Sequence, residues 1–290
     1  MNRNFLKRET FNGTFPFEPH FQEINGFQMH YIDEGKGEPI VCLHGMPTWS
    51  YLYRNFIQEL SKNNRVIVPD QMGFGKSDVP LDLPYKLEQH VDNFTKLLLK
   101  LNLRDITLVF QDWGGPISFG FAVDYPEKVK RLVIMNTSVG VMRSDRKPWY
   151  APMEEKGIYE QFIKNTADLV KSGMYKKNKF SDIMKEAYSA PFPDDDYYIG
   201  ALAWPKDIPI GDSHPSAKKM SYIRDNLSKL TEKQKILIWG MKDVIFPPKT
   251  IDWWQKIYPD IVVHKIEDAG HFLQEDAPFR IIKIIKKFIE

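Results

Sequence analysis

The segment that decides the fold is Thr107–Gly115, which reads Thr-Leu-Val-Phe-Gln-Asp-Trp-Gly-Gly. It begins in the apolar run Ile106–Phe110, which is short and rich in branched residues, as a strand buried on both faces should be. It leads into Ile117–Tyr125, whose composition and length predict a helix. The two glycines between them permit a sharp turn and close packing of helix on strand. The segment therefore predicts a strand-turn-helix unit of a parallel sheet, with Asp112 at the apex of the turn.

The same alternation of short apolar runs and longer helical segments continues in both directions along the chain. The other expected strands are Ile40–Leu43, Arg65–Pro69, Arg131–Met135, Lys235–Trp239 and Ile261–Ile266. The other expected helices are Tyr51–Leu60, His90–Leu101, Thr250–Tyr258 and a terminal helix from about Ala277. The alternating stretch Gly26–Glu34 predicts a half-exposed strand that pairs antiparallel at one edge. We therefore expect an α/β fold with a mostly parallel, doubly wound sheet.

Residues 138–228 interrupt this alternation. They contain aromatic residues, prolines and helical fragments such as Ile158–Lys171, but no strand-like apolar run. An insertion after the strand that ends near Met135 would lie over the carboxyl ends of the strands, where open α/β sheets bind ligands. We predict a helical cap formed by residues 138–228 on a core formed by residues 1–137 and 229–290.

Composition excludes several classes of protein. The chain has 290 residues, of which 42% are hydrophobic, enough for one domain with a large core. Its 40 basic and 38 acidic residues are mixed, so we expect no concentrated positive field for nucleic acid or an anionic membrane. The lone cysteine, Cys42, lies in an apolar run and can form no intrachain disulfide. With no apolar stretch near the roughly 18 residues of a membrane span, we expect a cytoplasmic protein.

Two further ionisable residues follow expected strands in the same way as Asp112. Asp243 lies just beyond Gly240, and His271 directly follows Gly270. Because the carboxyl ends of parallel strands share one edge of the sheet, the three side chains can meet there. The order nucleophile, acid, histidine is that of the α/β-hydrolase triad, in which Asp112 would take the place of the serine. We therefore predict the α/β-hydrolase fold; the alternative is that Asp112 only caps the helix that follows it.

The loop after the first parallel strand adds a fourth element. Leu43–Trp49 reads Leu-His-Gly-Met-Pro-Thr-Trp, and a His-Gly loop at this place supplies an oxyanion-hole backbone N–H in this fold. We expect the backbone N–H groups of Met46 and of Trp113 to be the two donors, which together stabilise a developing oxyanion. His44 itself is expected to be a buried structural residue.

Together these segments resemble the haloalkane dehalogenase family of aspartate-nucleophile α/β hydrolases. The resemblance covers most of the chain and is carried by His44–Arg54, Met72–Asp78, Gln111–Gly115, Ala190–Asp194, Gly240–Asp243 and Ala269–Phe272. It implies that Asp112 displaces halide from a small haloalkane and forms an alkyl ester, which a water activated by His271 then hydrolyses. Asp243 would orient the imidazole, although in some relatives the acid follows the preceding strand, where this chain has Asn136. No cofactor or metal is implied.

The resemblance also implies a halide site with two N–H donors. The indole of Trp113 stands where the family has one of them. Relatives take the second from an asparagine at the position of Met46 or from a cap tryptophan, and the thioether of Met46 cannot donate. Met174–Lys176 stand near the expected place of that cap tryptophan. Trp149 and Trp204 are the remaining substitutes, but packing of the cap is the favoured role for both.

Three other functions fit the same residues. An epoxide hydrolase would also need acidic donors, usually two cap tyrosines, and the cap offers Tyr150, Tyr159, Tyr175, Tyr188, Tyr197 and Tyr198. A β-lactone decarboxylase related to the dehalogenases would share the Asp112 turn and the His-Gly loop, again usually with asparagine where this chain has Met46. A non-catalytic small-molecule sensor is the third, and the intact set of Asp112, Asp243 and His271 argues against it. The sequence leaves substrate preference and oligomeric state open.

Overall fold

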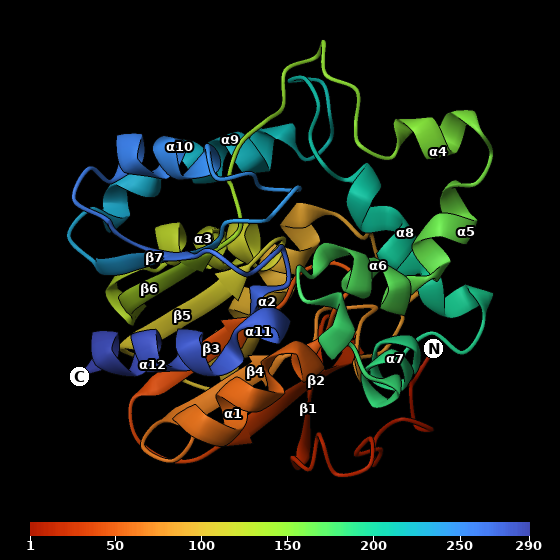
Figure 1. Ribbon diagram of the computed structural model, residues 1–290, viewed down its shortest axis with the longest axis horizontal. Helices are drawn as coiled ribbons and strands as arrows, with labels where there is room; N and C mark the ends of the chain where they lie inside the picture. Colours follow the sequence, from red (N-terminus) through yellow and green to blue (C-terminus); the bar gives the residue numbers. More distant parts are fainter.

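The computed structural model describes residues 1–290 and shows an eight-stranded sheet between two layers of helices (Figure 1). The strand order is β1-β2-β4-β3-β5-β6-β7-β8; β1 pairs antiparallel with β2, β2 pairs antiparallel with β4, and the remaining strands are parallel. The strands are β1 (Pro19–Ile24), β2 (Phe27–Glu34), β3 (Pro39–Leu43), β4 (Arg65–Pro69), β5 (Ile106–Gln111), β6 (Val129–Met135), β7 (Gln234–Gly240) and β8 (Val262–Ile266). The α/β-hydrolase fold expected from the sequence is confirmed.

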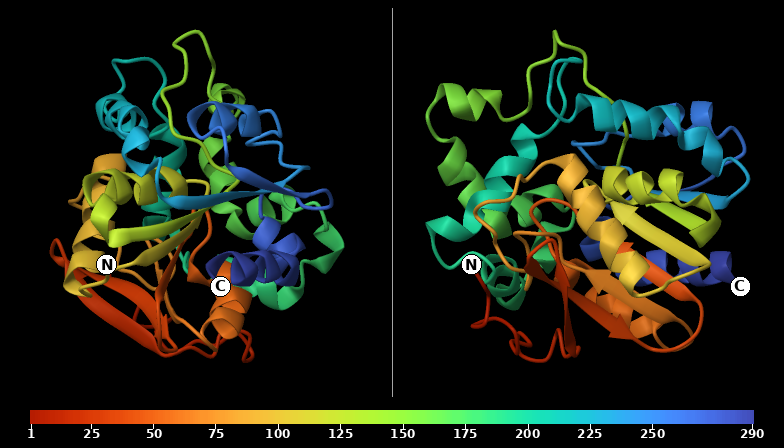
Figure 2. Two further views of the ribbon diagram at one scale, coloured as in Figure 1. Left: turned by 90° about the vertical axis from the view of Figure 1, so that its left-hand side faces the viewer. Right: turned by 180° about the vertical axis from the view of Figure 1, so that it is seen from behind.

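Helices cover both faces of the sheet (Figures 1 and 2). The α-helices outside the 138–228 segment are α1 (Arg54–Leu60), α2 (Leu87–Lys100), α3 (Gly114–Asp124), α10 (Thr250–Ile257), α11 (Leu273–Asp276) and α12 (Pro278–Ile289). Helices α1 and α12 pack together on one face, while α2, α3 and α10 lie on the other. None of the helices is long and apolar enough to cross a membrane.

Alternation along the buried strands explains the two layers. In β5, Leu108 and Phe110 belong to the hydrophobic cluster beneath α2 and α3, whereas Val109 belongs to the cluster on the opposite face. Successive side chains of a strand point to opposite faces, so a strand whose side chains are all buried, as in β5, must be covered on both faces. The sequence did not indicate β1, whose residues are mostly half-buried. Because β1 takes the outer position, β2 is not the edge strand that was expected.

Six α-helices lie between β6 and β7: α4 (Ala151–Glu155), α5 (Tyr159–Lys164), α6 (Thr166–Gly173), α7 (Asp182–Ser189), α8 (Ile199–Lys206) and α9 (Ala217–Asp225). We call α4–α8 the cap helices, because they gather beyond the carboxyl ends of the strands (Figure 1). The helix expected over Ile158–Lys171 is two helices, because Asn165 has non-helical dihedral angles. Helix α9 instead packs against α2 and α3. The core and cap boundaries stay a prediction, and the packing of α9 favours an earlier end of the cap than residue 228.

Candidate active site

Asp112 lies on a strained turn between β5 and α3. Its φ is +54°, in the left-handed region that a side chain other than glycine seldom adopts. A Cβ at Gly114 would come within 2.3 Å of the carbonyl oxygen of Leu43, so the first residue of α3 must be glycine. Such strain costs about 1–3 kcal/mol and is typical of functional sites. The turn presents the Asp112 carboxylate at the carboxyl edge of the sheet.

The carboxylate of Asp112 contacts the His-Gly loop rather than the helix. The backbone N–H of Met46 donates to Oδ1 at 2.8 Å, and α3 has no side-chain cap. Gly45 permits this approach, since a Cβ there would lie 2.2 Å from the same oxygen. Burial raises the pKa of Asp112 and outweighs the opposing effects of His271 and of the backbone amides of Trp113 and Met46. The capping interpretation of Asp112 is therefore not supported.

His271 lies between two carboxylates. Its Nδ1 is 2.9 Å from Asp243 Oδ2, and its Nε2 is 3.6 Å from Asp112 Oδ2. Burial is the largest single influence on the pKa of His271 and lowers it, but the charge and hydrogen bond of Asp243, together with Asp112, raise the pKa above its usual value. The structure thus brings together Asp112, Asp243 and His271, the three side chains that the sequence placed at the carboxyl ends of the strands.

Asn136 holds the acid in place, a role that sequence reasoning missed. Its Nδ2 donates to Asp243 Oδ2 at 2.6 Å, while its Oδ1 accepts the backbone N–H of Gly240 at 2.8 Å. The other oxygen of Asp243 accepts the backbone N–H groups of Ile245 and Phe246. Every lone-pair region of the carboxylate therefore faces a donor, which fixes the oxygen that meets His271. The only signal in the sequence was a polar residue directly after a buried strand.

Gln111, the residue before Asp112, is a second residue that sequence reasoning missed. Its Nε2 lies 2.8 Å from His271 Nε2 and 3.5 Å from His271 Nδ1. An atom close to both ring nitrogens lies over the imidazole face and not along the in-plane lone pair of Nε2. The side chain therefore supports the ring from one face and leaves Nε2 free to face Asp112. No position in the sequence indicated this contact, because it joins residues 160 positions apart.

A cavity of about 510 Å³ opens above these groups, between the core and the cap helices. Asp112, Trp113, Met46 and His271 line it together with mainly apolar residues of the cap and of the loop after β7. The indole N–H of Trp113 has no hydrogen-bond partner within the protein, so it is free to meet a bound group. No cluster of His, Cys, Asp or Glu is arranged to hold a metal ion.

The two candidate cap tryptophans differ sharply in their surroundings. Trp204 is buried and its indole donates to His90 Nε2 at 2.6 Å, so this N–H is committed. Burial lowers the pKa of His90 to about 3, which keeps it neutral and able to accept. Trp149 instead lines the cavity, and its indole N–H has no partner within the protein. Of the two, only Trp149 offers an N–H to the cavity.

Comparison with known proteins agrees with this geometry. A model of the alpha/beta hydrolase fold family matches residues 38–278. Haloalkane dehalogenase 2 of Mycobacterium tuberculosis is 34% identical over 283 residues, which are 94% of this chain and 96% of that protein. The chain belongs to the haloalkane dehalogenase family. It is therefore an α/β-hydrolase enzyme.

Other members and neighbours of the family align with nearly the whole chain. The solved tetrameric haloalkane dehalogenase DpaA of Paraglaciecola agarilytica NO2 superposes with a TM-score of 0.81 at 30% identity, covering 94% of this chain and 92% of that chain. A cis-3-alkyl-4-alkyloxetan-2-one decarboxylase of Shewanella oneidensis is 37% identical over 94% of this chain and 89% of that protein. The family therefore has relatives of two named activities at comparable similarity to this chain.

Proposed function

We propose that the enzyme hydrolyses carbon–halogen bonds of small haloalkanes through a covalent ester on Asp112, giving alcohol, halide and a proton. The observation that carries this proposal is the arrangement of Asp112, with its carboxylate in an apolar cavity beside the unpartnered indole N–H of Trp113. We also propose that it works in the cytoplasm, since its one cysteine, Cys42, is a buried thiol that needs no oxidising compartment.

In the first step, Asp112 Oδ2 attacks the carbon that bears the halogen. A carbon–oxygen bond forms as the carbon–halogen bond breaks, and the halide leaves with the bonding electrons. An ionised carboxylate needs no base for this displacement. We assign the indole N–H of Trp113 to the departing halide, because a desolvated donor stabilises charge most where it develops in the transition state.

In the second step, a water attacks Cγ of the esterified Asp112 while His271 Nε2 takes its proton. The negative charge collects on Oδ1, which already accepts the Met46 N–H, and we assign the backbone N–H of Trp113 as the second donor. The ester bond then breaks and the alcohol leaves with a proton. Asp243 stabilises the imidazolium. Alkylation also removes the Asp112 charge, one of the influences that raise the pKa of His271, so the ester lowers that pKa and frees the base.

A β-lactone decarboxylase is the second candidate, favoured by two relatives that are named as such enzymes. The Shewanella relative of that name is 37% identical to this chain. An epoxide hydrolase is less well supported, because no tyrosine lines the cavity to donate to an epoxide oxygen.

Halide and proton release on a mixed panel separates these functions. We expect the enzyme to release halide from 1,2-dibromoethane, 1-iodobutane or 1,3-dibromopropane in step with acid, because an apolar cavity of this size admits short chains. The same protein is offered a cis-3,4-dialkyl-oxetan-2-one and styrene oxide. Alkene and carbon dioxide from the lactone, with no halide from any haloalkane, would transfer the proposal to the decarboxylase.

Met46→Asn should strengthen dehalogenation by adding a second halide donor. The side-chain amide would enter the cavity beside Trp113, while the backbone N–H that holds Asp112 is unchanged. We expect kcat/KM to rise about tenfold, equivalent to one net hydrogen bond to a charged group. Steady-state halide release measures it. Met46→Leu, which has no donor, is the matched control and should stay near the parent value; equal gains in both variants would point to cavity shape instead.

A further inference from the structure

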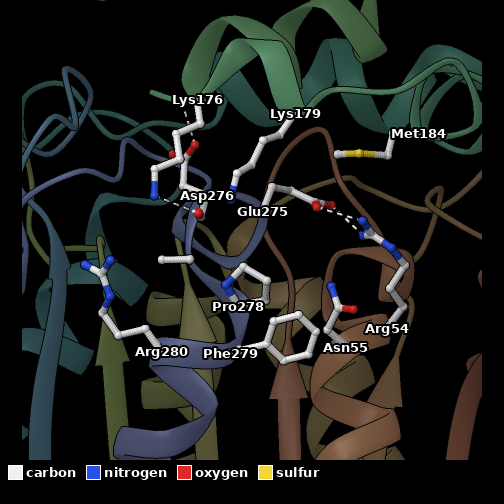
Figure 3. A pocket seen from close by; sticks show the side chains of 11 residues that line it. Arg54, Asn55, Lys176, Lys179, Met184, Glu275, Asp276, Pro278, Phe279 and Arg280 are labelled. Carbon is white, nitrogen blue, oxygen red and sulfur yellow. Dashed lines mark hydrogen bonds and ion pairs between the residues drawn. The ribbon is translucent and has the colours of Figure 1, made fainter.

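Two buried acids, Glu275 and Asp276, follow His271 on the short helix α11; Glu275 contacts the cap helix α7, and Asp276 contacts the segment that follows α6. They stand beside a second pocket of about 350 Å³ at the seam between core and cap (Figure 3). Glu275 accepts two hydrogen bonds from Arg54 of α1, at 2.6 and 2.8 Å, and another from the hydroxyl of Tyr188 on α7. Glu275 therefore joins core and cap through side chains alone.

Asp276 makes a different connection. Its Oδ2 accepts the backbone N–H of Gly270 at 2.8 Å and that of Tyr175 at 2.9 Å, and its Oδ1 accepts the backbone N–H of Lys176 at 2.7 Å. The residue is fully buried. One carboxylate thus binds the residue before His271 and the two cap residues that follow Met174.

The backbone of the His271 loop also contacts the cap directly. The N–H of His271 donates to the carbonyl of Gly173 at 2.8 Å. A Cβ at Gly270 would come within 2.4 Å of that same carbonyl oxygen, so the two segments touch without intervening side chains. Gly173 ends α6, and Leu169, Ser172 and Gly173 line the active-site cavity. The histidine and one wall of the cavity are therefore held by the same set of hydrogen bonds.

We propose that Asp276 is a positioning residue that fixes His271 against the cap segment Gly173–Lys176. The inference rests on the proposed covalent mechanism, in which His271 serves only the hydrolysis of the ester. Asparagine at this position keeps one acceptor oxygen and turns the other into an NH2 donor, so at least one of the three buried N–H groups loses its acceptor and faces a donor instead. The His271 loop is then held less firmly against the cap. The displacement step, which uses Asp112 and no base, keeps its rate.

The test compares Asp276→Asn with Glu275→Gln. Both variants neutralise a buried acid of α11 that contacts the cap, but only the first changes the contact with the His271 loop. Single-turnover reactions quenched over time and weighed by mass spectrometry give the alkylation and hydrolysis rates separately. We expect hydrolysis in Asp276→Asn to slow about 100-fold, the usual effect of a misplacement near 1 Å, so that the alkyl-enzyme accumulates. Glu275→Gln should lower Tm and accumulate none.

Hydrogen exchange supplies a readout that does not depend on activity. Peptides that contain Gly270, Tyr175 and Lys176 should exchange faster in Asp276→Asn than in Glu275→Gln. If Asp276→Asn does not fold, Lys176→Pro removes one of the three donors, and Lys176→Ala is its control because it loses the side chain but keeps the N–H.

Each outcome decides a different claim. Alkylation and hydrolysis that fall together in Asp276→Asn, or an adduct that accumulates equally in the Glu275 variant, would overturn the positioning role. If the parent enzyme and its His271→Ala variant form no adduct at all, the covalent mechanism fails instead. Hydrogen exchange then still shows whether Asp276 fastens the His271 loop to the cap.

Discussion

Asp112→Asn should abolish turnover, with kcat reduced by about 10⁴-fold or more, the range found for loss of a catalytic nucleophile. An amide oxygen is a poor nucleophile, so no ester forms. The substitution keeps the shape of the side chain and the acceptor for the Met46 N–H. It also removes a carboxylate whose burial is unfavourable, as the raised pKa of Asp112 shows. We therefore expect the Tm of the variant to equal or exceed that of the parent. Halide release and thermal unfolding measure the two effects.

Full activity in a freshly purified Asp112→Asn protein would exclude Asp112 as the nucleophile. The mass of the intact protein must accompany that result, because deamidation of the asparagine restores the parent aspartate. Activity that appears slowly, in step with a one-dalton gain, would instead support the assignment.

His271→Ala should stop the reaction after one turnover. Displacement continues without a base, so each enzyme releases about one halide ion and then carries the alkyl group as an ester on Asp112. Hydrolysis loses its base, and we expect it to slow by about 10³-fold or more. Mass spectrometry of the intact protein measures the added alkyl group, and peptide mapping places it on Asp112.

An adequate control for this variant is His264→Ala, at the outer strand β8 and away from the cavity. It should turn over many times and show no adduct. Continued loss of substrate by the His271 variant without any adduct would contradict the assignment of His271 as the base that activates water.

The sequence predicted the parts of the site that depend on strand ends, and missed those that depend on contacts between distant side chains. Asp112, Asp243 and His271 could be placed because buried strands have a recognisable composition and parallel strands end at one edge. The support from Asn136 was not predicted: this residue also follows a buried strand, but nothing in the sequence shows that its amide donates to Asp243. The contact of Asp276 with Tyr175 was equally invisible, since it requires the folded position of the cap.

The two candidate cap tryptophans also depend on a contact between distant residues that the sequence does not reveal. Sequence alone gave Trp149 and Trp204 equal standing as donors to the cavity. Which indole is free depends on His90, a histidine on α2 that accepts the N–H of Trp204. Strand β1 was missed for another reason, because its half-buried residues have no clear apolar alternation.

The hydrogen bond between Asn136 and Asp243 also limits how this family can diverge. A lineage that gained an aspartate at position 136 first would place two carboxylates a hydrogen bond apart in a buried site, and one would have to keep its proton. A lineage that lost Asp243 first would leave His271 with no acid beside it. Both single-step intermediates are impaired, so moving the acid from one strand end to the other requires two coupled substitutions.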